Sequence, residues 1–234
     1  MTKKKILIIS IIAILITAIT ATCIYVFGTY LPEKKAREER LKAVEEYTRA
    51  KLNKYEEENA TIADVDVVFL GDSLTDLCDL SIYYPEYKAL NRGIGGDTTF
   101  TLEKRLKISV YDVKPKAVVM LIGANNFKTM FDNYEDILIK LKTNLPDSKI
   151  ILVSLTAMSG EFWGAHNEIA CFNNVRIKKL AEKYNFSYVD AFTPLYDLDT
   201  FGIHPSYTTD GGHLTHEGYL VLSSVIKAKL DEVL

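Results

Sequence analysis

The chain has 234 residues, 48% of them hydrophobic, and a formal net charge of −3 at pH 7. This size and apolar content fit one membrane segment plus one domain of ordinary size. Residues 61–234 carry 23 acidic against 17 basic side chains, a balance that argues against a nucleic-acid-binding protein, which usually has a basic face.

Residues 1–32 are predicted to be a membrane anchor. Lys3 to Lys5 precede a stretch from Ile6 to Pro32 that contains no charged residue. As a helix, Ile6–Phe27 would span about 30 Å, the thickness of the hydrocarbon core. The alternative is a cleaved signal peptide, whose apolar part has about 7–15 residues and ends at a small-residue site of a kind that this run lacks. A short basic tail before a long domain favours a single-pass anchor with the domain outside the cytoplasm.

Residues 33–60 are predicted to form a charged helical stalk. They are rich in helix formers, and charges of opposite sign recur at i,i+4 spacing. Leu41, Val44, Tyr47 and Leu52 give a thin apolar stripe. A coiled-coil dimer is the alternative, but the stripe is short and irregular for a heptad pattern, so the oligomeric state stays open.

Residues 61–234 are predicted to form an α/β domain. Short buried strands that alternate with helices indicate a parallel sheet covered on both faces, that is, a three-layer α/β/α sandwich with a five-stranded parallel sheet. Ligands of such sheets bind beyond the carboxyl ends of the strands. The expected strands are residues 65–70, 87–91, 117–122, 149–155 and 186–189, and the expected helices are residues 98–107, 133–143, 173–184 and 217–233.

The first polar motif, Gly71-Asp72-Ser73-Leu74, follows directly after the first strand. The glycine permits a sharp turn out of the strand, which would place Ser73 at the start of a helix. Backbone N–H groups and the helix dipole favour negative charge there, as an alkoxide or an oxyanion requires. The alternative is that Ser73 or Thr75 is only a helix cap.

Two further motifs follow the second and third strands. The segment from Asn91 to Thr99 contains three glycines, which let a ligand approach the backbone, although a tight turn would also explain them. It matches neither a Walker loop nor the Gly-x-Gly-x-x-Gly spacing of a dinucleotide site. In Gly123-Ala124-Asn125-Asn126, an Asn side chain would either stabilise the loop or point its amide into the crevice as an oxyanion donor.

The last motif, Asp210-Gly211-Gly212-His213, precedes the final helix. Its Asp and His are three residues apart, so the carboxylate could fix the imidazole tautomer and leave Nε2 to take a proton from a serine. A metal site is the competing hypothesis, because His204 and His216 lie close by in the sequence. No cysteine and no His-Glu-x-x-His pattern accompanies them.

In this order, the four motifs resemble the blocks of the SGNH or GDSL-type hydrolase superfamily. The resemblance covers about Val65 to the C-terminus. The sequences of the glycine and asparagine motifs most resemble those of the branch that contains platelet-activating-factor acetylhydrolase-like enzymes. They also resemble those of bacterial lysophospholipase- and acetylesterase-like members. The resemblance implies a flavodoxin-like strand order and hydrolysis of carboxylic esters through a covalent acyl-enzyme.

The resemblance also implies a role for each matching residue. Ser73 would be the nucleophile, His213 the general base and then the general acid, and Asp210 the residue that orients His213. The oxyanion hole would consist of the Ser73 and Gly96 backbone N–H groups and the Asn125 side chain.

Two positions depart from the pattern of many members. Asn126 stands where Asp is common, which the acetylhydrolase-like branch tolerates. Gly211 and Gly212 stand between Asp210 and His213, and the extra flexibility is expected to loosen that pair without changing its spacing.

The sequence therefore predicts a membrane-tethered serine esterase that needs neither a cofactor nor a metal. A non-catalytic binding module of the same fold is the alternative from another class. The substrate stays open among acylated or acetylated glycans, lipids and small esters. Phe162 and Trp163, after the fourth strand, would line an acyl or sugar pocket or simply pack within their loop. Cys78 and Cys171 are interpreted as packing residues, and the sequence does not show whether they pair.

Overall fold

The computed structural model describes residues 2–234, apart from the side chains of residues 9, 12 and 13. The chain divides into two compact units, one up to Lys51 and one from Leu52 to Leu234. The first unit is a continuous helix made of α1 (Lys3–Tyr25), a π-helical turn (Val26–Tyr30) and most of α2 (Leu31–Asn59). By length and composition alone, this helix is a candidate to cross a membrane.

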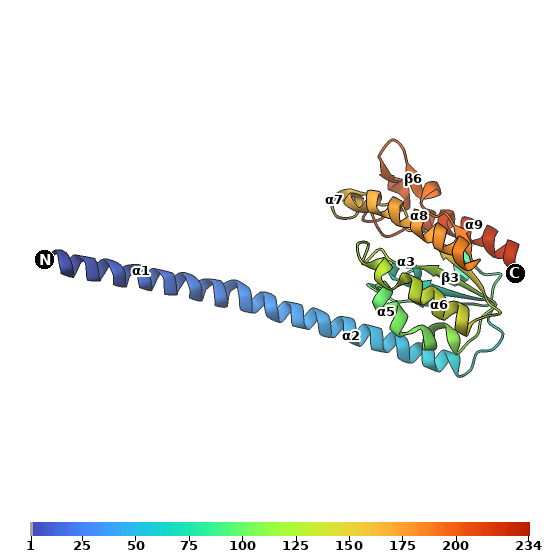
Figure 1. Cartoon of the computed structure of the whole chain (residues 1–234), viewed down its shortest axis with the longest axis horizontal. Helices are drawn as coiled ribbons and strands as arrows, with labels where there is room; N and C mark the ends of the chain where they lie inside the picture. The colour runs from blue at the N-terminus through green and yellow to red at the C-terminus, as the bar shows by residue number, and fades with distance from the viewer. Residues whose placement is uncertain (1) are drawn as a thin grey trace. The chain divides into compact units, whose positions relative to one another are not determined.

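The second unit contains a parallel sheet, of which β3 is labelled in Figure 1. The sheet has five strands in the order β2-β1-β3-β4-β5. This confirms the predicted parallel sheet and its flavodoxin-like order. Most of the central strand residues are buried, because helices cover both faces. The strands are β1 (Val67–Gly71), β2 (Ala89–Gly93), β3 (Ala117–Leu121), β4 (Lys149–Val153) and β5 (Ser187–Val189).

Two apolar clusters, one on each face of the sheet, form the core. Alternate side chains of β1, such as Val68 and Leu70, face a cluster with α5 (Thr99–Lys104), α6 (Tyr134–Asn144) and α8 (Asn167–Tyr184). The side chains between them, such as Phe69, face α4 (Leu80–Tyr83) and α9 (His216–Val233). The three-layer sandwich is therefore as predicted.

Two helices differ from their predicted ranges. The helix expected over 98–107 ends at Lys104, and a separate π-helical turn follows at Lys107–Tyr111. The helix expected from residue 173 starts at Asn167, whose side chain bonds both the N–H and the carbonyl of Met158 and so anchors the helix to the chain after β4.

A small antiparallel hairpin, β6 (Tyr196–Asp197) and β7 (Gly202–Ile203), was not predicted. Strands of two residues are too short to show an alternating pattern. The Asp197 carboxylate closes the hairpin by accepting hydrogen bonds from the Asp199 N–H and the Thr200 hydroxyl.

Candidate active site

Ser73 is the first residue of α3 (Ser73–Asp76), immediately beyond the carboxyl end of β1. The cap of this helix is Asp72, whose Oδ1 accepts the Leu74 N–H at 3.2 Å. The hydroxyl of Ser73 is therefore not used as the cap that the alternative hypothesis proposed. It faces His213 instead.

Ser73, His213 and Asp210 form a continuous chain of hydrogen bonds. Ser73 Oγ lies 3.1 Å from His213 Nε2, and His213 Nδ1 lies 2.7 Å from Asp210 Oδ2. An ionised Asp210 accepts from Nδ1–H, which leaves Nε2 free to accept the serine proton. The fold brings together three predicted residues from the two ends of the domain sequence.

Asp210 is well suited to remain ionised beside the imidazole. Partial burial opposes its charge, but hydrogen bonds from the His213 backbone, the His213 side chain and the Gly212 N–H outweigh burial and lower the pKa of Asp210 to about 2. The same bonds hold the loop between the two residues. A negative partner for His213 is thus available at all ordinary pH values.

The loop between Asp210 and His213 is packed, contrary to the expectation that its glycines loosen the pair. A Cβ on Gly212 would lie 2.6 Å from the Trp163 indole, so only glycine allows the ring to approach this closely. The indole also meets the His213 ring edge-on, with centroids 6.0 Å apart. The Gly211 carbonyl accepts the Ser159 N–H at 2.8 Å. The glycines therefore make close contacts possible.

Two of the three predicted oxyanion donors, Gly96 and Asn125, lie on loops that contact each other. Gly96 has a φ of +83°, a conformation that suits glycine, and it is exposed between β2 and α5. The side-chain amide of Asn125 donates to the backbone carbonyl of Asp97, the residue after Gly96, at 2.9 Å. The Asn126 side chain holds α5 instead: its Oδ1 accepts the Thr99 N–H, and its amide donates to the Thr99 hydroxyl.

A cavity of about 390 Å³ adjoins Asn125. The pair predicted to line a pocket, Phe162 and Trp163, forms one wall of it, and the Phe162 ring is largely exposed. The cavity is lined by Ala124, Asn125, Asn126, Phe127, Lys128, Thr129, Phe162, Trp163 and His166.

The residues of the competing metal hypothesis have separate partners. His204 Nδ1 bonds Ser206 Oγ, and His216 Nδ1 bonds the Tyr83 hydroxyl. Across residues 2–234, no group of three or more His, Cys, Asp or Glu side chains is placed to hold a metal ion. The cysteines at 23, 78 and 171 are free thiols.

Asp72, the residue before Ser73, has an unusual environment. It is 1% exposed, and its Oδ2 has no hydrogen-bond partner among the described residues. Burial, with a smaller contribution from Asp97, raises the pKa of Asp72 to about 7 from its ordinary value of 3.8. Between these two values, the folded state holds a proton that the unfolded state has lost, so stability falls as the pH rises.

We therefore expect Asp72→Asn to gain stability relative to the wild type as the pH rises from about 4 to 7, by about 4 kcal/mol at most. Denaturant unfolding at several pH values measures this. Asp79→Asn is the matched control, because Asp79 caps α4 but is exposed and its Ser81 hydrogen bonds lower its pKa. Parallel pH profiles for wild type and Asp72→Asn would rule out a buried, protonated Asp72.

Arg105 is a buried residue that sequence reasoning missed. Its guanidinium bonds the Asp97 carboxylate at 2.6 Å, beside the predicted oxyanion loop. An Arg at the end of a predicted helix resembles a solvated helix terminus, so its own position did not indicate burial. The only indication was Asp97 itself, an acidic residue next to three glycines.

Comparisons with known proteins show the family to which this domain is similar. A profile of the GDSL-like Lipase/Acylhydrolase family matches residues 69–221. Over 99 residues, the chain is 36% identical to the alpha2 subunit of platelet-activating factor acetylhydrolase IB from Homo sapiens; this covers 38% of the chain and 43% of that protein. The chain thus spans less than half the length of the curated relatives that it matches.

Solved structures give the same picture of the fold. A GDSL-like lipase from Bacteroides thetaiotaomicron superposes with a TM-score of 0.70 at 25% identity, over 78% of this chain and 98% of that one. An acetylxylan esterase from Geobacillus stearothermophilus, in a catalytic mutant form, superposes with a TM-score of 0.58 at 19% identity, over 72% and 95%.

Proposed function

Because the chain belongs to the GDSL-like lipase/acylhydrolase family, we propose that it is a serine esterase that cleaves acyl or acetyl esters. The observation that carries the proposal is the continuous hydrogen-bond chain from Ser73 through His213 to Asp210. A hydroxyl bonded to an imidazole that is itself oriented by a carboxylate is the arrangement that activates serine as a nucleophile.

The proposed reaction has two acyl-transfer steps. Ser73 Oγ attacks the ester carbonyl carbon while His213 Nε2 takes its proton, and Asp210 stabilises the imidazolium. The negative oxygen of the tetrahedral intermediate accepts hydrogen bonds from the Ser73 and Gly96 N–H groups and from the Asn125 amide. His213 then gives its proton to the leaving alcohol. Water, activated by His213, attacks the acyl-enzyme and releases the acid.

Hydrolysis of p-nitrophenyl esters tests this proposal. The full chain in detergent should release p-nitrophenol from short acyl esters, in the presence of EDTA, and should lose this activity on treatment with a fluorophosphonate. A protein that loses activity with EDTA but resists the fluorophosphonate would contradict the proposal. A series of acyl chain lengths and acetylated polysaccharides would identify the preferred ester; the acetyl esters named for two relatives make acetyl the first choice.

We also propose that residues 1–32 anchor the enzyme in a membrane and that residues 33–60 form a charged helix, which serves as a stalk up to Lys51 and belongs to the compact unit of the catalytic domain from Leu52 onward. The catalytic domain, residues 61–234, would lie outside the cytoplasm. The support is the uncharged run after Lys5 and the exposure of its apolar side chains, such as Ile14 and Ile19. In cells, the protein should stay in the membrane pellet after alkaline carbonate and dissolve only in detergent. Release by carbonate, or processing after the apolar run, would favour the signal-peptide alternative.

A further inference from the structure

The loop that carries Gly96 joins β2 to α5 and forms hydrogen bonds with two neighbouring segments. We call residues Ile94–Thr98 the Gly96 loop. On one side, the Gly95 N–H donates to Asp76 Oδ2 at 2.9 Å, and Asp76 lies in the same short helix as Ser73. On the other side, Asn125 donates to the Asp97 carbonyl. The segments with the three proposed oxyanion donors are therefore joined by direct hydrogen bonds.

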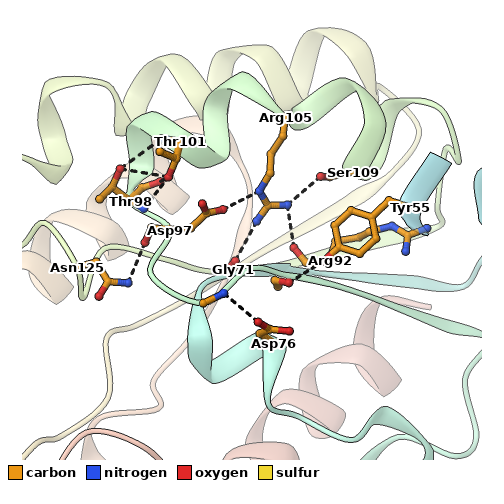
Figure 2. Close-up of polar contacts among 12 residues, drawn as sticks. Tyr55, Gly71, Asp76, Arg92, Asp97, Thr98, Thr101, Arg105, Ser109 and Asn125 are labelled. Atoms are coloured by element: carbon orange, nitrogen blue, oxygen red, sulfur yellow. Dashed lines mark hydrogen bonds and ion pairs between the residues drawn. The ribbon is translucent and has the colours of Figure 1, made fainter. Parts of the chain in front are cut away.

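Arg105 lies at the centre of these contacts (Figure 2). Its guanidinium is almost fully buried and makes four hydrogen bonds in different directions. It donates to the Asp97 carboxylate at 2.6 Å, to the Arg92 carbonyl at 2.9 Å, to the Gly71 carbonyl at 3.0 Å and to Ser109 Oγ at 2.8 Å. Gly71 is two residues before Ser73, so one side chain joins the end of β1, the end of β2 and the Gly96 loop.

The shape of the guanidinium is essential for this arrangement. A planar fork with five N–H donors can serve several fixed acceptors at once, whereas a lysine ammonium acts as a single point of charge on a flexible stem. The break between α5 and the following π-helical turn falls at Arg105. The helix thus ends where the side chain turns inward.

The end of α2 contacts the end of β2, which directly precedes the Gly96 loop. Tyr55 is 2% exposed, and its hydroxyl donates to the Gly93 carbonyl at 2.6 Å, at the end of β2. Its ring lies 4.4 Å from the Arg92 guanidinium. Arg92 is buried and bonds Glu58 and Asn59, also from α2. The last two turns of α2 therefore hold the strand from which the Gly96 loop emerges.

We propose that Arg105 and Tyr55 are positioning residues of the oxyanion hole: Arg105 fixes the Gly96 loop against β1, and Tyr55 fixes the strand end that precedes it. This inference rests on the proposed function. Both side chains are almost fully buried, so neither is placed to contact a substrate. Each acts through the backbone that aims the Gly96 N–H, which must be held to about 0.5 Å to stabilise a transition state.

The test compares Arg105→Lys and Tyr55→Phe in the full chain. Both keep the bulk of the side chain, and Arg105→Lys keeps the charge. Active enzyme is counted by the amount of fluorophosphonate bound, so that kcat is expressed per reactive serine. We expect kcat to fall on the order of 10²-fold for Arg105→Lys and about 10-fold for Tyr55→Phe. KM should change less than threefold, and the pH dependence of kcat should keep its shape because His213 and Asp210 are untouched.

Two matched substitutions serve as controls. Arg176→Lys alters an exposed arginine that stacks on Phe131, and Tyr47→Phe alters an exposed tyrosine of the same helix as Tyr55. Both should keep the wild-type kcat. If Arg105→Lys does not fold, Asp97→Asn tests the same contact, because it removes the carboxylate charge that Arg105 binds but keeps an acceptor oxygen and the side-chain size. A fall in kcat per reactive serine is expected for this variant as well.

The possible failures are distinguishable. If the wild type neither hydrolyses esters nor binds the fluorophosphonate, the proposed function is wrong. If the wild type is active and the folded variants keep kcat per reactive serine within twofold, with only a lower melting temperature, the two residues merely stabilise the fold and the inference is overturned.

Discussion

Replacing Ser73 by alanine is expected to lower kcat for a short p-nitrophenyl ester on the order of 10⁴-fold or more. In the proposed mechanism, this variant loses the oxygen that attacks the ester carbonyl, and the remaining oxyanion donors cannot form an acyl-enzyme. The fold should persist, because Asp72 rather than Ser73 caps α3. Steady-state kinetics and a thermal melt of the same sample measure both effects.

Ser206→Ala is the matched control for this experiment. Ser206 is an exposed serine that also contacts a histidine, since its Oγ lies 2.8 Å from His204 Nδ1. That pair has no carboxylate partner equivalent to Asp210 among the described contacts, and the variant should keep wild-type turnover. Full activity in Ser73→Ala, or its loss in Ser206→Ala, would show that the nucleophile has been assigned wrongly.

Replacing Asp210 by asparagine is expected to lower kcat on the order of 10³–10⁴-fold with little change in the fold. An amide oxygen can still accept the N–H groups of Gly212 and His213. The NH₂ group would then face His213 Nδ1 and favour the tautomer with the proton on Nε2, which cannot accept a proton from Ser73. The imidazolium would also lose its negative partner.

Asp190→Asn provides a close control, because Asp190 makes the same local turn. Its Oδ1 accepts the N–H groups of Phe192 and Thr193, two and three residues ahead, and its Oδ2 bonds the Thr193 hydroxyl instead of an imidazole. This variant should retain activity. Equal kcat values for Asp210→Asn and Asp190→Asn would mean that Asp210 only shapes its loop.

Much of the fold was predictable because buried strands can be recognised in the sequence as short apolar runs. Runs such as Ala117–Leu121 are apolar on both faces of the strand, as is typical of a parallel sheet that helices cover on both sides. The family profile over residues 69–221 confirms the resemblance that the four polar motifs indicated. Ser73, Asp210 and His213 could be selected because each stands at a strand end or a helix start with a distinctive spacing.

The contacts around those residues could not be predicted in the same way. Trp163 meets Gly212 and His213 only because the chain after β4 folds back toward the start of α9, which no local pattern records. Arg105 is a charged residue at a helix end, where solvent exposure is the usual outcome, yet two of its four hydrogen-bond partners are backbone carbonyls of distant strands. Every residue type has the same backbone carbonyl acceptor, so the sequence does not show which carbonyl will bind a buried side chain.

The most direct test of the central claim is to locate the covalent adduct formed by a fluorophosphonate. The full chain is labelled in detergent, digested and analysed by tandem mass spectrometry, with Ser73→Ala treated in parallel. We expect one modified serine, Ser73, and no labelling of the variant. An adduct on another residue, or unlabelled protein that still hydrolyses esters, would contradict the account.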